Sequence, residues 1–209
     1  MAESGMTTIP LFPLGTVLFP DGYLPLRIFE VRYLDLIRQC VANHTQFGVV
    51  ALSSGNEVQV AGQVERFVEI GAMAEVLEAT PIKAGVMSIR CRGGKRFRVL
   101  SCEQQKNGLW LAETEALAPD QVVPIPPELD DTARSLGHLI AALQQEGITP
   151  QDFPLLPPFK LDECGWVSNR WCDLLPLGLE EKQRLLTLDN ALLRLELVQD
   201  LLDDRGWLE

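Results

Sequence analysis

The chain has 209 residues, of which 46% are hydrophobic and 22% are charged, as in ordinary globular proteins that bury one or two cores. Its net charge of −11 is uneven: residues 1–118 hold 11 Lys+Arg and 12 Asp+Glu, whereas residues 119–209 hold 7 and 17. The acidic second part repels phosphate, which argues against nucleic-acid binding there. No stretch has the pattern of a signal peptide or the length of a membrane-spanning helix, so we expect neither.

The first organised segment is rich in proline and then changes its pattern. Pro10, Pro13, Pro20 and Pro25 lie among apolar residues, and each restricts the backbone to extended geometry. We therefore expect short edge strands joined by a turn at residues 21–22. From residue 29 the apolar positions follow helical spacing and predict one buried helical face. These positions are Phe29, Tyr33, Leu36, Ile37, Cys40 and Val41.

This opening resembles the N-terminal, substrate-binding domain of Lon proteases. Several prolines and an Ile-Phe-Glu-x-Arg-Tyr segment occur in the same order within one short window. The matching residues are Pro10–Pro13, Val17, Phe19-Pro20, Leu24–Leu26, Ile28–Glu30 and Arg32-Tyr33. The alternative is a proline-rich strand leading into an ordinary core helix.

Between residues 47 and 117 the chain favours strands. Residues 47–52 form an apolar run, and residues 86–92 alternate between apolar and polar positions. Asn107-Gly108 predicts a hairpin with a type I′ turn, and Gly93-Gly94 predicts a second hairpin turn. Several short strands with glycine-containing turns are typical of a small barrel or sandwich.

After residue 117 the pattern becomes helical. Residues 118–127 contain four prolines and predict a stiff, extended linker. Leucines and isoleucines then recur at helical spacing over residues 129–143, and further helices are expected at 162–175 and from 180 onward. Asp189 is a candidate N-cap for the last helix. Packing of several helices would bury these apolar stripes.

The second part extends the resemblance to the Lon N-terminal region. The matching segments are Trp166–Trp171, Leu174–Pro176 and Glu181–Leu186. The resemblance implies an α+β protein, with a PUA-like β-barrel over residues 1–118 followed by a helical bundle over residues 119–209. It also implies a role in recognising protein substrates, because ATP hydrolysis and proteolysis belong to other parts of Lon proteases.

No catalytic residues can be assigned from the sequence. Gly94-Lys95 is followed by Arg96, and Ile89 stands where a phosphate-binding loop requires its first glycine. No lysine lies in a recognisable Ser-Lys motif. His44 lies in a polar turn and His138 on a predicted helix, where a solvated or packing role is the favoured interpretation of each. Five cysteines without Cys-x-x-Cys spacing indicate reduced thiols in a cytoplasmic protein. We expect a non-enzymatic protein without a metal site or cofactor.

A basic cluster raises an RNA-associated PUA-like module as the alternative function. It consists of Arg90, Arg92, Lys95, Arg96 and Arg98. The cluster lacks interleaved aromatic residues on which bases could stack, so pairing with nearby glutamates is the favoured interpretation. We therefore do not expect nucleic acid to be the main partner.

The candidate binding residues are aromatic. Phe159, Trp166 and Trp171 lie near a proline-rich segment between the predicted strand and helical parts, where grooves are common. They could grip an extended apolar segment of an unfolded protein, or they could simply join the two parts. We predict a non-catalytic, cytoplasmic module that binds unfolded or hydrophobic polypeptide segments and could act with a protease complex.

Overall fold

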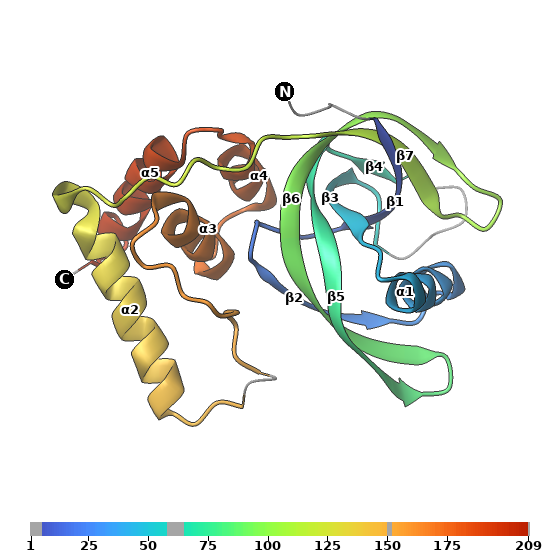
Figure 1. The fold of residues 1–209 in the computed structure, drawn as a ribbon, viewed down its shortest axis with the longest axis horizontal. Coiled ribbons are helices and arrows are strands. Elements are labelled where there is room, and N and C mark those ends of the chain that lie inside the picture. The colour runs from blue at the N-terminus through green and yellow to red at the C-terminus, as the bar shows by residue number, and fades with distance from the viewer. Residues whose placement is uncertain (1–5, 58–64, 150–151, 209) are drawn as a thin grey trace. The chain divides into compact units, whose positions relative to one another are not determined.

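The computed structural model describes residues 6–57, 65–149 and 152–208. The chain has a mixed fold of strands and helices and divides into two compact units, Met1–Pro119 and Asp120–Glu209 (Figure 1). The first, here the strand unit, contains β1 (Thr7–Leu14), β2 (Tyr23–Ile28), α1 (Val31–Asn43), β3 (Phe47–Ser54), β4 (Arg66–Phe67), β5 (Ile70–Lys83), β6 (Val86–Gln104) and β7 (Trp110–Ala116). The second, here the helical unit, contains the 3₁₀ helix η1 (Pro127–Leu129), α2 (Asp130–Gln145), α3 (Cys164–Leu174), α4 (Leu179–Thr187) and α5 (Ala191–Asp203).

The seven strands form one large, mostly antiparallel sheet. The strand order is β1-β7-β6-β5-β3-β4, and β1 also pairs in parallel with β3. The pairings among β1, β7, β6, β5 and β3 therefore run in a closed circuit. Among the described residues, β2 pairs with β6 alone, so its other edge is open.

The long strand β6 pairs with β2, β5 and β7, and its course shows that the predicted turn at Gly93-Gly94 was wrong. Gly93-Gly94 is not a hairpin turn, because β6 continues through it from residue 86 to residue 104. At this point β6 exchanges β2 for β7 as its neighbour, and its register with β5 shifts. A Cβ atom on Gly93 would lie 1.9 Å from the carbonyl oxygen of Phe19. The glycine therefore permits a close backbone approach within the sheet.

Helix α1 supplies much of the apolar core of the strand unit. Tyr33 and Ile37 are buried against side chains from β1, β3, β5 and β6. The predicted helical face is displaced, however. Phe29 precedes the helix and is 53% exposed, and Val41 is 47% exposed. Arg32 and Leu34, which the apolar spacing did not include, are buried on α1 instead.

The connection between β6 and β7 is the predicted hairpin, with a different turn. Gly108 has a φ of 85°, whereas Asn107 is not among the described residues with positive φ. Because a type I′ turn requires positive φ at both central residues, that assignment was wrong. The Asn107 side chain instead accepts a hydrogen bond from the Leu109 amide at 3.0 Å.

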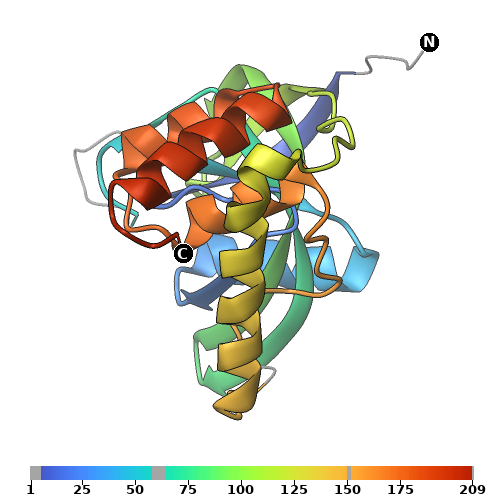
Figure 2. The same cartoon turned by 90° about the vertical axis from the view of Figure 1, so that its left-hand side faces the viewer.

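The helical unit contains four α-helices among its described residues. Figure 2 shows α5 crossing the N-terminal end of α2, where Gln199 donates a hydrogen bond to the Glu128 carbonyl at 3.0 Å. The N-cap of α5 is Asn190, whose side chain accepts from the Leu193 amide, rather than the predicted Asp189. None of the helices in the described ranges combines the length and apolarity that a membrane span needs.

A buried arginine links several segments of the helical unit. Arg194 is 1% exposed and pairs with Asp120 at 2.6 Å. The same side chain donates to the carbonyl oxygens of Leu185 and Leu188 and to the side-chain oxygen of Asn169. The start of the unit, α3, and the α4–α5 connection are therefore held by one guanidinium group.

Candidate functional site

The three predicted binding residues lie in the helical unit. Trp166 and Trp171 belong to α3, and Phe159 lies in the segment that precedes it. The ring of Phe159 is 6.1 Å from that of Trp166 and also 6.1 Å from that of Phe153. Trp171 contacts Trp207 instead, at 6.3 Å, and its indole N–H donates to the Thr132 carbonyl at 2.9 Å. The structure therefore brings Phe159 and Trp166 together and places Trp171 in a separate contact.

Burial separates the roles these aromatic residues can play. Trp166 and Trp171 are each 3% exposed, and Phe159 is half-buried. The two indoles therefore offer almost no surface to a partner, which favours the interpretation that they hold the unit together. Phe159 keeps an accessible part. The binding role of the three residues stays a prediction.

A buried ion pair lies next to these aromatic residues. Arg170 is fully buried, its guanidinium lies 5.7 Å from the centre of the Trp166 ring, and it pairs with Asp173 at 2.8 Å. Burial raises the pKa of Asp173 to about 6, although the positive charges of Arg170 and Lys182 act in the opposite direction. The folded chain therefore takes up a proton at Asp173 near pH 6.

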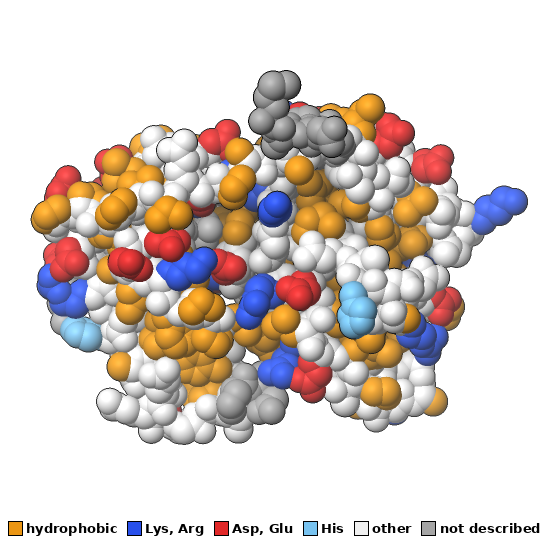
Figure 3. All heavy atoms as spheres, viewed as in Figure 1, with side chains coloured by type: hydrophobic (Ala, Val, Ile, Leu, Met, Phe, Trp, Pro, Cys, Tyr) orange, Lys and Arg blue, Asp and Glu red, His pale blue; other side chains and the backbone are white. Residues whose placement is uncertain are grey.

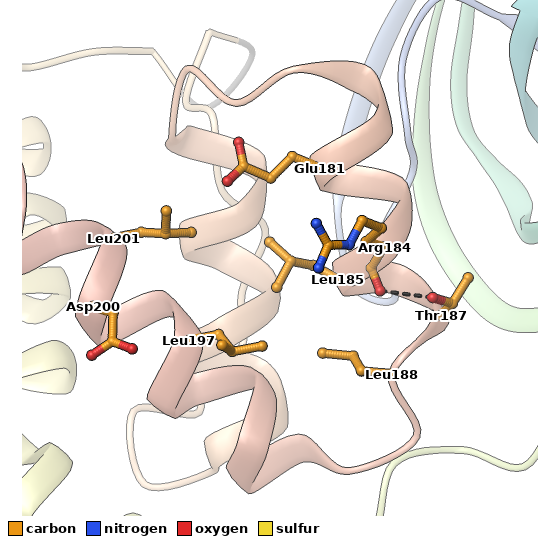
Figure 4. A pocket seen from close by; sticks show the side chains of 8 residues that line it. All are labelled: Glu181, Arg184, Leu185, Thr187, Leu188, Leu197, Asp200 and Leu201. Atoms are coloured by element: carbon orange, nitrogen blue, oxygen red, sulfur yellow. Dashed lines mark hydrogen bonds between the residues drawn. The ribbon is translucent and has the colours of Figure 1, made fainter.

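An apolar groove of the helical unit lies between α4 and α5. It encloses about 340 Å³ and is lined by Leu185, Leu188, Leu197 and Leu201, with Glu181, Arg184, Thr187 and Asp200 around them. Figure 4 shows leucine side chains converging from α4, from α5 and from Leu188 just after α4, with Glu181 and Asp200 near the margin. We call this surface the α4–α5 groove. Its volume lies within the range of small-ligand pockets.

The groove exists because α5 is apolar on more than one face. Leu195, Val198 and Leu202 are fully buried and form the face that packs on the unit. Leu197 and Leu193 lie on other faces and are 39% and 42% exposed. A helix with apolar residues beyond one stripe has apolar surface left over for a partner. The sequence contained this signal, but the sequence-based prediction considered only the buried stripe.

The electrostatic setting of the groove is acidic. Residues 120–209 contain 7 Lys+Arg and 17 Asp+Glu. Acidic side chains lie among apolar ones on the face shown in Figure 3, over the part of the view where α2 and α5 lie. A partner for this unit would therefore gain from neutral or basic residues beside its apolar ones.

The predicted basic cluster does not form a continuous basic surface. Arg90 pairs with Glu78, and Arg96 is only 4% exposed. Of the five residues in the cluster, Lys95 and Arg98 are the exposed ones. A phosphate backbone needs several accessible cations along its path, so this arrangement gives the RNA-binding alternative no support.

Groups that could perform catalysis are scattered. Within the described ranges, no set of three or more His, Cys, Asp or Glu side chains could hold a metal ion. His44 is an exposed residue at the end of α1, and His138 is exposed on α2. Four of the five free cysteines are buried, and burial raises the pKa of Cys91 and of Cys172 to about 12, which suppresses the reactive thiolate.

The chain is similar to domains of known proteins along most of its length. The family model described as the ATP-dependent protease La (LON) substrate-binding domain matches residues 8–204. A crystal structure of a Lon N-terminal domain protein from Xanthomonas campestris is 31% identical, has a TM-score of 0.66, and is matched over 93% of this chain and 98% of that one. The N-terminal domain of Mycobacterium avium complex Lon protease is 16% identical with a TM-score of 0.58 over 95% and 99% of the two chains, and shows the same fold.

Two curated relatives are much longer than the matched region. Lon protease from Parabacteroides distasonis is 26% identical over 189 residues, which are 86% of this chain and 22% of the relative. Protein cereblon from Danio rerio is 28% identical over 131 residues, which are 59% of this chain and 28% of the relative. The chain thus spans about a quarter of the length of these relatives.

Proposed function

Because the chain belongs to the ATP-dependent protease La (LON) substrate-binding domain family, we propose that it binds apolar segments of unfolded polypeptides. The observation that carries the proposal is the α4–α5 groove, in which four leucines line a surface of a strongly acidic unit. Unfolded proteins expose the aliphatic side chains that native proteins bury, and such a groove removes them from water.

The groove has the properties of a transient binding surface. Its volume of about 340 Å³ admits more than one aliphatic side chain, and the exposed part of Leu197 makes its floor accessible. Glu181 and Asp200 favour segments whose flanking residues are neutral or basic. We expect dissociation constants on the order of micromolar, which allows a recognition module to release its clients.

The aromatic cluster is the second element of the proposal. Phe159 is half-buried and adjoins Trp166, so its accessible edge could contact a client. Trp166 and Trp171 would act mainly by fixing α3 beneath such a contact. This division of roles explains why one aromatic residue stays accessible while the two indoles are covered.

The proposal also includes the barrel, the two folding units, the cellular location and the adaptor role that the sequence predicted. We infer that the closed strand circuit is a PUA-like barrel and that residues 1–118 and 119–209 are separate folding units. The protein would act in the cytoplasm without catalysis of its own, as an adaptor that presents clients to a protease complex. The description of the family as a substrate-binding domain supports this role.

Fluorescence anisotropy tests the groove with labelled leucine-rich peptides. Three peptides share one apolar centre and carry lysine, serine or glutamate flanks. We expect the lysine-flanked peptide to bind most tightly and the glutamate-flanked peptide most weakly. Leu197→Asp should weaken binding about tenfold or more, because it places a charge on the apolar floor.

Leu193→Asp is the matched control. Leu193 is 42% exposed on the same helix but does not line the groove. We expect it to bind peptides like the parent chain, with a similar thermal midpoint in both variants. Equal loss of binding in the two variants, or no binding by the parent, would contradict the groove assignment.

A further inference from the structure

A second groove lies in the strand unit, along the open edge of β2. It encloses about 170 Å³ and is lined by Phe12 and Leu14 from β1, by residues 25–30, by Tyr33 from α1 and by Glu57. Its size suits one aliphatic side chain. We call it the β2-edge groove. The α4–α5 groove is formed by the other unit, so the two surfaces share no residues.

Backbone groups along this edge have no strand partner in the part of the chain that the structure describes. The Gly93 amide donates to the Gly22 carbonyl at 2.9 Å, so Gly22 directs its carbonyl toward β6. Along an antiparallel strand, every second residue directs its backbone groups toward the same neighbour. Leu24, Leu26 and Ile28 therefore direct their backbone groups toward β6, and Pro25 and Arg27 direct theirs to the open edge. Pro25 has no N–H to offer, but its carbonyl and both backbone groups of Arg27 can pair with another strand.

A buried polar group in the groove also needs a partner. Tyr33 is 1% exposed, its ring stacks on Phe12 with centroids 3.7 Å apart, and its hydroxyl has no hydrogen-bond partner among the described residues. Such a group loses its interactions with water without compensation. Burial raises the pKa of Tyr33, so the hydroxyl stays protonated and can donate to a carbonyl oxygen.

Arg27 indicates the charge of the occupant. Its side chain is exposed on the open strand, and no ion pair holds it among the described residues. In an added strand, the residue opposite Arg27 would place its side chain on the same face, where a carboxylate could pair with it. Its two neighbours would point to the face of Leu26 and Ile28, toward the groove.

We propose that the β2 edge takes up an extended segment of another polypeptide as an additional strand, in which an acidic residue opposite Arg27 adjoins an aliphatic residue seated in the β2-edge groove. Backbone pairing with Pro25 and Arg27 supplies affinity, and the alternating side chains supply specificity. The Tyr33 hydroxyl donates to the carbonyl group that enters with the aliphatic residue. This site favours acidic segments, whereas the α4–α5 groove favours basic ones.

The test uses labelled peptides with the pattern Thr-Val-Glu-Val-Thr, the same peptide with lysine in place of glutamate, and the glutamate peptide methylated on its central backbone nitrogen. We expect the glutamate peptide to bind the full chain about fivefold to tenfold more tightly than either of the others. It should also slow hydrogen exchange of the Arg27 amide. Equal binding of the methylated peptide would overturn strand addition.

Two variants and a matched control test whether Arg27 and Tyr33 contribute to peptide binding. Arg27→Glu should reverse the preference so that the lysine peptide binds more tightly. Arg38→Glu changes an exposed arginine of the same unit outside the groove, and should leave the preference unchanged. Tyr33→Phe should weaken binding several-fold without lowering the thermal midpoint, because it removes only an unpaired hydroxyl.

Three outcomes would contradict the proposal. If Arg27→Glu and Arg38→Glu show the same preference between the glutamate and lysine peptides, Arg27 does not contact the peptide. If Tyr33→Phe binds the glutamate peptide as tightly as the parent chain, the Tyr33 hydroxyl makes no contact with it. A concentration-dependent dimer of the free chain that Arg27→Glu abolishes would assign the edge to a second copy instead. The proposal is independent of the α4–α5 groove, because Leu197→Asp should leave binding of the glutamate peptide unchanged.

Discussion

The strand unit and the helical unit achieve a stable core in different ways. In the strand unit, ladders of backbone hydrogen bonds join β1, β7, β6, β5 and β3, and Arg32 adds contacts to Glu65 and to the Gly108 carbonyl. In the described part of the helical unit no strand ladder joins the helices, and Arg194 on α5 connects the start of the unit, α3 and the end of α4. Replacing a single buried side chain should therefore lower the unfolding free energy more in the helical unit, because fewer backbone hydrogen bonds join its elements.

The largest expected effect comes from replacing Arg194. Arg194→Met leaves Asp120 and two carbonyl oxygens without their buried partner, which should cost about 3–5 kcal/mol of unfolding free energy. Hydrogen exchange should accelerate across residues 120–208 and stay slow in the strand unit. Arg205→Met is the control, because the Arg205 side chain is exposed and, among the described residues, donates to the Leu201 carbonyl alone. Equal destabilisation by both variants would break the comparison.

Replacing a buried aromatic residue of the helical unit should cost more unfolding free energy than replacing a half-buried one. Trp171→Ala removes a side chain that is 3% exposed and a hydrogen bond to Thr132, so we expect a loss of about 3–5 kcal/mol. Phe159→Ala should cost distinctly less, since Phe159 is half-buried. Thermal midpoints and peptide affinities of the two variants measure this. A weakened affinity with an unchanged midpoint in Phe159→Ala would support its contact with clients, whereas a lower midpoint with unchanged affinity would restrict it to packing.

The strand unit should be most sensitive where backbones meet. Gly93→Ala places a methyl group 1.9 Å from the Phe19 carbonyl oxygen, and we expect a loss of about 1–3 kcal/mol. Gly178→Ala is the matched control, because a Cβ at that position meets nothing within 4 Å. Denaturant unfolding of both variants provides the measurement. A Gly93→Ala protein as stable as the control would show that the close approach can relax.

These glycines also show where sequence reasoning reaches its limit. A glycine pair between two strand-like segments locally indicates a turn, yet Gly93 lies inside β6 because a distant carbonyl passes close to it. The same limit applies to Arg194, whose partner Asp120 lies 74 residues earlier in the chain. Local patterns placed α1, the β6–β7 hairpin and α2 near their observed positions. Contacts between distant segments decided the rest, including the α4–α5 groove.

The smallest expected effect concerns the ion pair of α3. The folded pKa of Asp173 is raised to about 6 from its ordinary 3.8, so between these values the folded chain holds a proton that the unfolded chain releases. The contribution is therefore fully present below pH 4 and is lost as the pH rises through 6, and it amounts to at most about 3 kcal/mol. Unfolding free energies of the parent and Asp173→Asn at pH 4, 5, 6 and 7 measure it. The difference between the two should change over this range, and a constant difference would contradict the raised pKa.

Hydrogen exchange with a lysine-flanked, leucine-rich peptide tests the proposed function most directly. The account predicts that the peptide slows exchange in the C-terminal half of α4 and along α5, around Leu185, Leu197 and Leu201, and that this protection disappears in Leu197→Asp but persists in Leu193→Asp. No protection in α4 and α5 at peptide concentrations that saturate anisotropy would contradict it, because the client would then bind elsewhere.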